Sequence, residues 1–374
     1  MNAIRPTKVL MTADAVGGVW TYATELASGL AALGIEVHLV TMGPPPRDEQ
    51  RTMLRDLRVR LIESSLALEW QDAGGDDLPN ARRFLADLEE AIQPDIVHLN
   101  SFREATFDWN APCVVVAHSC VNSWGIACND TQWLSEPKWQ HYTRAVAAGL
   151  DAARAWVAPS RAFHDVIHDL YRPRSPGKVI WNGIPSATTL PGSKRRFILA
   201  AGRMWDAAKN LAALARASRS LDWPVFVAGS TSEAGGHDPG ALTLIGNLAH
   251  EALRSRMQHA AIFASPALYE PFGLSVLEAA SAGCALVLSD IPTFRELWDG
   301  AALFVDPHDD RALHQALATL CSDDGQRAQL QRAAWERSKS YSLTETTGRY
   351  FSLYEGLVNT RECSASHRLV EVHA

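Results

Sequence analysis

Paired cysteines and clustered metal ligands are missing from this 374-residue sequence. Its six cysteines form no CxxC pair and show no zinc-type spacing. Disulfides persist mainly in oxidising compartments, so we expect reduced thiols in a cytoplasmic protein. Histidines and carboxylates are not clustered at ligand spacing either, so we expect no metal ion and no other cofactor.

Long hydrophobic runs and a surplus of positive charge are also missing. No stretch approaches the ~18–20 apolar residues that span a bilayer, and residues 1–8 lack the apolar core of a signal peptide. The net charge of −7 argues against a nucleic-acid-binding protein, because such proteins need positive charge to neutralise phosphates. The sequence also lacks an internal repeat, a low-complexity tract and a convincing nucleophile–base pair for covalent catalysis.

What is present is the composition of an ordinary globular protein, with 47% hydrophobic and 21% charged residues. A chain of this length is expected to form two domains, each with its own core. Short apolar strands alternate with amphipathic helices, beginning with strand 8–12, a helix from Val19 and strand 35–41, and this predicts an α/β fold with parallel sheets. The turn-rich segment 182–193 interrupts the alternation, so we place a domain boundary after residue 183.

Two glycines, Gly17 and Gly18, follow the first predicted strand and precede its helix. They do not complete a dinucleotide-binding fingerprint, because the third glycine is absent and Glu36 is a weak match to the ribose-binding acid. Two interpretations stay open: a tight turn that lets a diphosphate approach the helix N-terminus, or a simple connection between strand and helix. Asp14 is likewise either a substrate contact or a turn residue.

The stretch 265–283 runs from the end of an apolar strand through a loop into a helix with a glycine stop. Glu270 lies in the loop, and the backbone N–H groups of 273–275 are expected at the helix start, where the macrodipole favours an anion. Glu278 follows within the helix, so the stretch combines acceptors for sugar hydroxyls with a binding site for phosphate. The alternative is a capping box with Ser275 as the N-cap and Glu278 at N3.

Two cations, Arg203 and Lys209, lie between a predicted strand at 197–201 and the helix that follows. Arginine binds phosphate oxygens through two parallel hydrogen bonds, and lysine acts as a point charge. Fixed cations at this position would stabilise the negative charge of a departing diphosphate. The alternative is a pair of solvated surface cations.

The string Glu-Pro-Phe-Gly-Leu-Ser-Val-Leu-Glu-Ala at 270–279 closely resembles the donor-site signature of family 4 of the retaining glycosyltransferases. Arg-x5-Lys-Asn at 203–210, after a strand that ends in glycine, resembles the diphosphate clamp of the same family. The resemblance covers most of the chain and implies the GT-B fold, in which two Rossmann-like, doubly wound domains face each other across a cleft. It implies an N-terminal acceptor domain at 1–183 and a C-terminal sugar-nucleotide donor domain at 184–342.

The resemblance also assigns roles to particular residues. Arg203 and Lys209 would hold the diphosphate, Glu270 would bind sugar hydroxyls, and His118 would contact the transferred sugar. Glu278 would bind the ribose hydroxyls, and the turn at 246–248 would meet the base. The implied catalytic residues are His118, Arg203, Lys209 and Glu270, and the implied donor-binding residues are Gly17, Gly18, Leu248, Phe272, Gly273, Leu274, Ser275 and Glu278.

For the reaction, the resemblance implies that a hexose moves from a nucleoside-diphosphate sugar to a hydroxyl acceptor with retention of configuration. The acceptor would attack from the face that the diphosphate leaves, with no enzyme nucleophile and no metal. Asp14 and Trp124 are candidate acceptor contacts, and the acceptor is a glycan, a lipid-linked saccharide or a small molecule. A lipid-linked acceptor would place the protein at the inner face of the membrane. The sugar, the base, the linkage and the oligomeric state are not predicted.

Three further interpretations stay open. A GT-B epimerase would consume a sugar nucleotide without an acceptor, and a phosphorylase would need a lysine for pyridoxal phosphate, which nothing in the sequence marks. A non-catalytic sugar-nucleotide-binding protein would not need an intact charge clamp.

Finally, the family predicts that a last helix at about 343–360 packs back onto the first domain, and the composition of 361–374 predicts a disordered tail.

Overall fold

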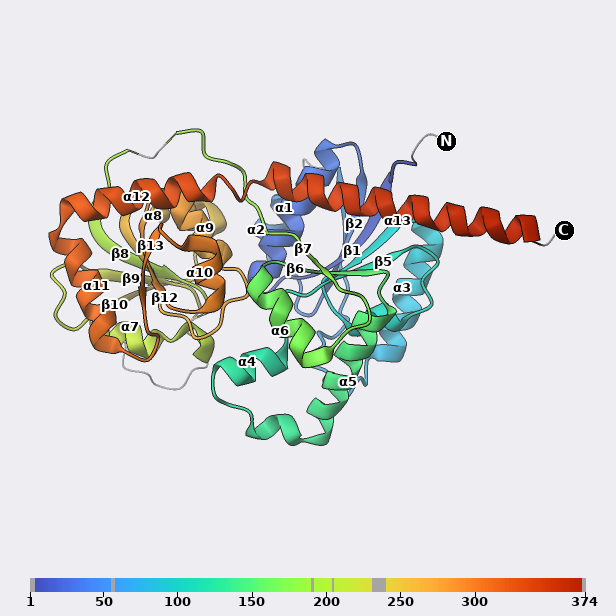
Figure 1. Cartoon of the computed structure of the whole chain (residues 1–374), viewed down its shortest axis with the longest axis horizontal. Coiled ribbons are helices and arrows are strands. Elements are labelled where there is room, and N and C mark those ends of the chain that lie inside the picture. The colour runs from blue at the N-terminus through green and yellow to red at the C-terminus, as the bar shows by residue number, and fades with distance from the viewer. Residues whose placement is uncertain (1–3, 55–57, 190–191, 204, 231–239, 372–374) are drawn as a thin grey trace. The chain divides into compact units, whose positions relative to one another are not determined.

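The computed structural model describes residues 4–54, 58–189, 192–203, 205–230 and 240–371, the last eleven by their backbone alone. The chain divides into two compact units (Figure 1). The first unit is made of residues 1–123, 131–183 and 343–374, and the second of residues 124–130 and 184–342. The predicted α/β class with two parallel sheets is confirmed.

The first unit is built on a seven-stranded sheet in which neighbouring strands pair in parallel throughout the described residues. Its order is β3-β2-β1-β4-β5-β6-β7, so the chain reverses its direction of travel across the sheet between β1 and β4. The central strands are apolar runs buried on both faces, as parallel strands covered by helices require. The strands are β1 (Lys8–Asp14), β2 (Glu36–Met42), β3 (Val59–Ile62), β4 (Ile96–Leu99), β5 (Cys113–Val116), β6 (Ala155–Ala158) and β7 (Lys178–Val179).

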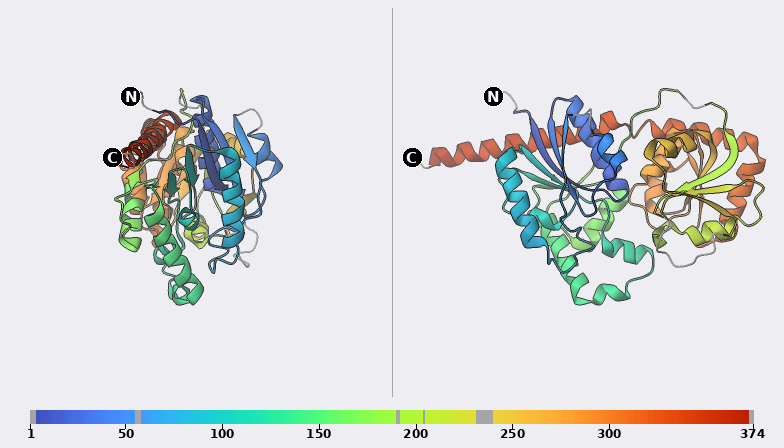
Figure 2. Two further views of the ribbon diagram at one scale, coloured as in Figure 1. Left: turned by 90° about the vertical axis from the view of Figure 1, so that its right-hand side faces the viewer. Right: turned by 180° about the vertical axis from the view of Figure 1, so that it is seen from behind.

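Helices lie on both sides of this sheet (Figure 2). α1 packs against α13, where Gly29 is required because an added Cβ would overlap the side chain of Thr347. The N-terminus of α6 is capped by Ser160, whose Oγ accepts a hydrogen bond from the amide of Phe163 at 3.1 Å. The helices of this unit are α1 (Gly18–Ala32), α2 (Asp48–Thr52), α3 (Leu78–Ile92), η1 (Arg103–Thr106), η2 (Gln132–Ser135), α5 (Pro137–Ala152), α6 (Arg161–Tyr171) and α13 (Leu343–Glu371). The helix α4 (Val121–Ala127) begins in this unit, and its residues from 124 onward group with the second unit.

The second unit repeats the same winding on six parallel strands in the order β10-β9-β8-β11-β12-β13. Its direction reverses between β8 and β11. The backbones at the ends of β8 and β9 approach so closely that a Cβ at Gly229 would overlap the carbonyl oxygen of Gly202. The strands are β8 (Arg195–Ala201), β9 (Val225–Ala228), β10 (Leu242–Gly246), β11 (Ala260–Ser265), β12 (Ala285–Ser289) and β13 (Ala302–Val305).

The core of the second unit is a cluster of aliphatic side chains between this sheet and its helices, with Ile198, Ile262 and Leu317 fully buried. The burial of these apolar side chains supplies most of the free energy that stabilises the folded unit. The helices are η3 (Ala207–Lys209), α7 (Leu211–Ala217), α8 (His250–His259), α9 (Leu274–Ser281), α10 (Pro292–Trp298), α11 (Asp310–Ser322) and α12 (Asp324–Ser338).

The structure differs from the expected organisation of the chain at two places. Residues 124–130, expected in the first domain, group with the second unit, where the indole Nε1 of Trp124 donates to Asp206 at 2.9 Å. The tail expected to be disordered from residue 361 continues α13 as helix to Glu371. Since no glycine or proline occurs after Gly356, nothing in the sequence interrupts the helical hydrogen bonds. Residues 372–374 lie outside the described part of the chain.

Candidate functional site

Each sheet has one topological switch point, and several of the predicted site residues lie in the loops beside these two points. Open parallel sheets bind ligands at the carboxyl ends of the strands where the winding reverses. In the first unit, the loop 15–17 follows β1, which pairs with β4. In the second unit, the loops 202–209 and 266–273 follow β8 and β11, which pair with each other.

In the second unit, Nζ of Lys209 lies 2.6 Å from Oε2 of Glu270, so the structure joins two residues that are distant in the sequence. Their side chains are 20% and 15% exposed, which leaves both accessible to a ligand. Asn210 fixes this arrangement because its side-chain amide donates to the carbonyl oxygens of Pro266 at 3.0 Å and Pro307 at 2.8 Å. The loop after β8 is thereby tied to the loop after β11.

Arg203 lies on the same loop as Lys209. Its guanidinium group is 3.2 Å from Oδ2 of Asp206 and lies over the ring of Trp205, with 5.5 Å between Cζ and the ring centroid. The side chain is 42% exposed, so the ion pair with Asp206 is partly solvated and adds little stability. Asp206 also accepts the amide of Ala208 through Oδ1 and so caps the short helix η3. Arg203 is therefore anchored on its own loop with its charge accessible.

The helix α9 begins at Leu274, after Gly273, which adopts the left-handed conformation with φ 89°. A Cβ at Gly273 would lie 3.1 Å from the ring of Phe294, so the position also limits side-chain size. The amides of Leu274 and Ser275 belong to the first turn, which has no intrahelical acceptors for its N–H groups. Beside them, Phe272 is buried against Tyr341 with a ring separation of 6.0 Å. The helix start therefore offers N–H donors on a rigid loop.

The capping-box interpretation of Ser275 and Glu278 is wrong. The N-cap is Gly273, no side chain caps the helix, and Ser275 already lies inside the first turn. Glu278 instead accepts a hydrogen bond through Oε1 from Nε2 of His250, at 2.7 Å. Glu278 does not cap its own helix, so its carboxylate is available to bind a ligand.

His250 is the first residue of α8 and was not identified from the sequence. It follows the turn at Gly246, where φ is 68°, and the half-buried Leu248. The turn leads into α8, which carries His250. Because α8 contacts α9, His250 meets Glu278 on that neighbouring helix. A histidine just after a turn has no distinctive pattern, so only the fold reveals its partner.

In the first unit, the glycine loop is a tight turn at the start of α1. Gly17 is the N-cap with φ 93°, and both Gly17 and Gly18 are exposed. The first turn of α1 contains no acidic residue, so no side-chain carboxylate there neutralises the positive end of the helix dipole. Oδ1 of Asp14 accepts the amide of Val16 at 2.9 Å, so Asp14 stabilises this turn.

His118 follows β5, and its Nε2 lies 2.8 Å from Oδ1 of Asn100. Its ring meets the ring of Tyr22 edge-on, with 4.4 Å between centroids. Burial, with a smaller contribution from neighbouring His98, lowers the pKa of His118 to about 3. His118 is therefore neutral at physiological pH. Asn100, His98 and Tyr22 were not identified from the sequence.

The described part of the chain holds neither a candidate membrane span nor a metal-binding cluster. No helix there is long and apolar enough to cross a bilayer. Within the same residues, no group of three or more histidines, cysteines and carboxylates is placed to hold a metal ion.

Two family models match the chain in sequence. Residues 16–187 match the model described as Glycosyltransferase Family 4, and residues 190–337 match the model described as Glycosyl transferases group 1. Together the two models span most of both compact units.

Curated relatives match parts of the chain. A phosphatidyl-myo-inositol mannosyltransferase of Mycolicibacterium smegmatis is 31% identical over 173 residues, which is 43% of this chain and 45% of the relative. Probable sucrose-phosphate synthase 3 of Arabidopsis thaliana is 34% identical over 95 residues, 24% of this chain and 9% of the relative. The chain thus matches less than half the length of these relatives.

Solved structures match nearly all of the chain. A sucrose-phosphate synthase from Thermosynechococcus elongatus has a TM-score of 0.78 at 18% identity, covering 95% of this chain and 100% of that one. The Anabaena protein HepE, in complex with UDP-glucose, has a TM-score of 0.70 at 15% identity, covering 94% and 100%. At these identities the likeness concerns the fold, and with the two family models it shows that the chain belongs to the group 1 glycosyltransferases of the GT-B fold.

Proposed function

We propose that this protein is a retaining glycosyltransferase that moves a hexose from a nucleoside-diphosphate sugar to a hydroxyl acceptor. The observation that carries the proposal is the arrangement at the β8/β11 switch point. There Lys209 contacts Glu270 at 2.6 Å, on loops that Asn210 ties together. The start of α9 follows the same loop and adds N–H donors. Cation, carboxylate and helix N-terminus are the groups that a sugar diphosphate requires.

The diphosphate is assigned to Arg203, Lys209 and the amides of Leu274 and Ser275. When the bond between sugar and diphosphate breaks, negative charge grows on the leaving oxygen. Fixed donors stabilise that charge more in the transition state than in the ground state, so they increase the rate rather than only the affinity. Glu270 orients Lys209 before the donor binds and is assigned to the sugar hydroxyls.

The nucleoside is assigned to Glu278 and to the turn that ends β10. His250 occupies Oε1 of Glu278, so we assign the other oxygen to the ribose hydroxyls. Leu248 lies just after the turn, and its backbone is assigned to the base. These assignments do not distinguish uridine, guanosine and adenosine.

The reaction is proposed to proceed by front-face attack, in which a donor phosphate oxygen takes the proton of the attacking hydroxyl. That mechanism needs neither an enzyme nucleophile nor a metal. The neutral His118 and the exposed amides of Gly17 and Gly18 are assigned to substrate hydroxyl and phosphate groups. Asp14 and Trp124 are retained as acceptor contacts, and a lipid-linked acceptor would add peripheral contact with a membrane.

The relatives support a sugar nucleotide as the donor. Two HepE structures are complexes with UDP-glucose and with UDP and glucose. The matched sequences include two mannosyltransferases and several sucrose-phosphate synthases, whose names indicate transfer to different acceptors. We therefore propose a hexosyltransferase and leave the particular hexose open.

A donor screen by thermal shift tests the proposal. UDP, GDP, ADP and their hexose conjugates are added to the full chain with EDTA present, because a ligand at 100 times its Kd stabilises by about 2.7 kcal/mol. One nucleotide should raise the melting temperature of the wild type and of Lys339→Ala by the same amount, and that of Lys209→Ala by less. Lys339 is a suitable control because it pairs with Glu336 at 2.8 Å in an exposed position.

Product analysis then separates the competing functions. The bound donor is incubated with glycan, lipid-linked and small-molecule acceptors, and the anomeric configuration of the product is read by NMR. Transfer with retention supports the proposal. Isomerisation of the donor without an acceptor would indicate an epimerase, and binding without turnover of any acceptor would indicate a non-catalytic protein. If no nucleotide stabilises the chain, the assignment of the donor site is wrong.

A further inference from the structure

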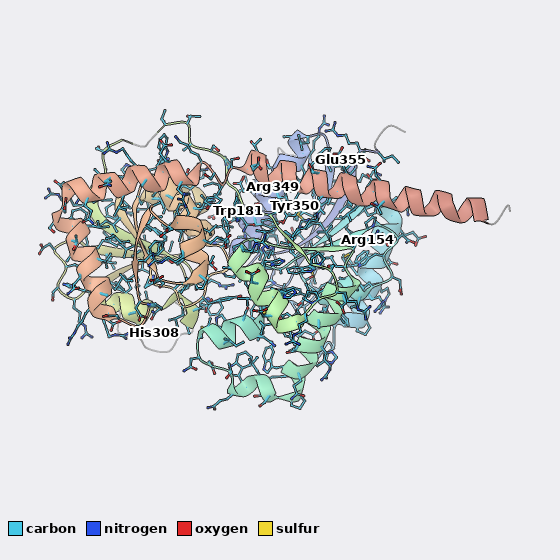
Figure 3. All side chains as sticks on the ribbon, in the orientation of Figure 1. Arg154, Trp181, His308, Arg349, Tyr350 and Glu355 are labelled. Carbon is cyan, nitrogen blue, oxygen red and sulfur yellow. The ribbon has the colours of Figure 1, made fainter. Side chains whose placement is uncertain are left out.

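A chain of hydrogen bonds runs through the core of the first unit and ends at His118. Oη of Tyr354, on α13, lies 2.6 Å from Nδ1 of His98, on β4. Nε2 of His98 lies 3.3 Å from Oδ1 of Asn100, and that oxygen lies 2.8 Å from Nε2 of His118. Tyr354 and His98 are fully buried. Figure 3 labels Tyr350, which lies one helical turn before Tyr354 on α13.

The orientation of the Asn100 amide follows from its other contact. Nδ2 lies 2.6 Å from the carbonyl oxygen of Thr12, which can only accept a hydrogen bond. The NH₂ group must therefore point to Thr12, and Oδ1 must point to the two histidines. Because Oδ1 can only accept, Nε2 of His118 must carry a proton.

The acceptor Oδ1 of Asn100 also favours a proton on Nε2 of His98. Its Nε2 faces Oδ1 of Asn100 at 3.3 Å and Oη of Tyr22 at 3.3 Å, so a proton on Nε2 satisfies this side of the ring. Nδ1 is then unprotonated and accepts the hydroxyl proton of Tyr354. Burial lowers the pKa of His98 to about 3, so the ring stays neutral and keeps one proton. The two lone pairs of Oδ1 are thereby matched to the two histidines.

For His118 the consequence is a single tautomer. A neutral imidazole with its proton on Nε2 has an unprotonated Nδ1, which can only accept. Among the described contacts of His118, none is a hydrogen bond to Nδ1. The ring is half-buried at the carboxyl end of β5, so Nδ1 is suited to a donor group of a substrate, such as a sugar hydroxyl.

We propose that Asn100 is a positioning residue that holds His118 in its Nε2–H tautomer and presents Nδ1 to a substrate hydroxyl. Tyr354, acting through His98, holds the same arrangement from α13, so the end of the chain helps to order a residue of the candidate site. The tautomer itself follows from contacts within the first unit. Its use toward a sugar hydroxyl rests on the proposed function.

The first experiment measures the tautomer directly. Long-range ¹H–¹⁵N NMR spectra of the full chain, labelled at histidine, distinguish protonated from unprotonated ring nitrogens, and His118→Gln identifies the His118 signals. In the wild type at pH 7.5, Nε2 should be protonated and Nδ1 unprotonated. An Nδ1–H tautomer, or an equal mixture, would overturn the proposal whether or not the protein transfers sugar.

Two variants of Asn100 separate positioning from mere structural support. Asn100→Ala removes the acceptor, so His118 should become a mixture of tautomers. By analogy with metal-binding histidines that lose the partner orienting them, kcat should fall by roughly 10–100-fold. Asn100→Asp keeps an acceptor, so the Nε2–H tautomer should persist and the pKa of His118 should rise beside the new carboxylate. A tautomer unchanged in Asn100→Ala, with circular dichroism confirming the fold, would contradict the role of Asn100.

The contribution of α13 is tested by a matched pair of tyrosine variants. Tyr350 and Tyr354 are both fully buried, but Tyr350 contacts His98 through its ring, at 5.4 Å between centroids, and donates no described hydrogen bond to it. Tyr354→Phe should change the ring-nitrogen signals of His98 and broaden those of His118, whereas Tyr350→Phe should leave the tautomers intact. Equal effects of the two variants would show that α13 acts by packing alone and would overturn this part of the proposal.

Discussion

The ammonium group of Lys209 lies 2.6 Å from a carboxylate oxygen of Glu270. The two residues come from loops that follow β8 and β11, the adjacent strands at the switch point of the second sheet. Both side chains keep some exposure, so the pair is neither a fully buried structural ion pair nor a free surface contact. This contact would orient Lys209 toward the proposed diphosphate site before the donor binds.

The first prediction concerns the rate. Lys209→Ala should reduce kcat for sugar transfer by about 10²–10³-fold, the scale for removing one donor that stabilises transition-state charge. The melting temperature without ligand should change little, because the pair is partly solvated. Steady-state kinetics with saturating donor measure the effect.

The control for this prediction is Lys339→Ala, which removes a lysine from an exposed pair with Glu336. Its kcat should equal that of the wild type. A near-normal rate in Lys209→Ala would show that the lysine does not stabilise the leaving group.

The second prediction concerns nucleotide affinity. Glu278→Gln should weaken binding of the donor nucleotide by about 10- to 100-fold, the equivalent of one hydrogen bond to a charged group. The fold should survive, since Gly273 rather than a side chain forms the N-cap of α9. Isothermal titration measures the affinity, and a 2′,3′-dideoxynucleotide serves as the matched ligand. If Glu278 binds the ribose, the variant and the wild type should bind that analogue equally.

The fold could be predicted where the spacing of apolar residues in the sequence matches the residues that the structure buries. The buried strands β1, β4 and β5 and the alternation with helices predict the two doubly wound sheets. β3 was missed because it is an edge strand with Arg60 exposed, so its pattern is not that of a buried run. α8 was missed because only Met257 among its residues is buried, and a mostly polar helix lacks a clear apolar stripe.

The candidate site could be predicted where several residues form one local string, as at 270–279. The partners of those residues could not, because they come from distant parts of the chain. His250 meets Glu278 across 28 positions, and Asn100 meets His118 across 18 positions. A single polar residue at the end of a strand carries no signal of which neighbouring loop it will contact. The sheet order supplies that information.

The third prediction concerns stability in acid. The pKa of His98 falls from 6.5 to about 3 on folding, so the unfolded chain binds more protons between these values. The stabilising contribution of the neutral ring is complete above about pH 6.5 and is lost as the pH falls toward 3. His98→Gln should be less stable than the wild type at pH 7.5, and the difference should shrink at pH 4.5. Urea denaturation at both values measures this, and a constant difference would contradict it.

The last prediction concerns stability in alkali and starts from Glu69, which is buried in the first unit. Its Oε1 accepts the amides of Phe102 and Arg103, the latter at 3.0 Å. Burial, followed by the nearby charge of Glu104, raises the pKa of Glu69 to about 8. The folded chain therefore retains a proton that the unfolded chain has lost.

For a raised pKa the contribution to stability is complete below the unfolded value of 4.5 and is lost as the pH rises through about 8. Glu69→Gln keeps the acceptor oxygen for both amides but does not titrate. Between pH 6 and 9, the free energy of unfolding should therefore fall more steeply in the wild type than in Glu69→Gln, so the variant should gain relative stability at pH 9. Urea denaturation across this range tests the sign, and parallel curves for the two proteins would show that Glu69 is already ionised at pH 6.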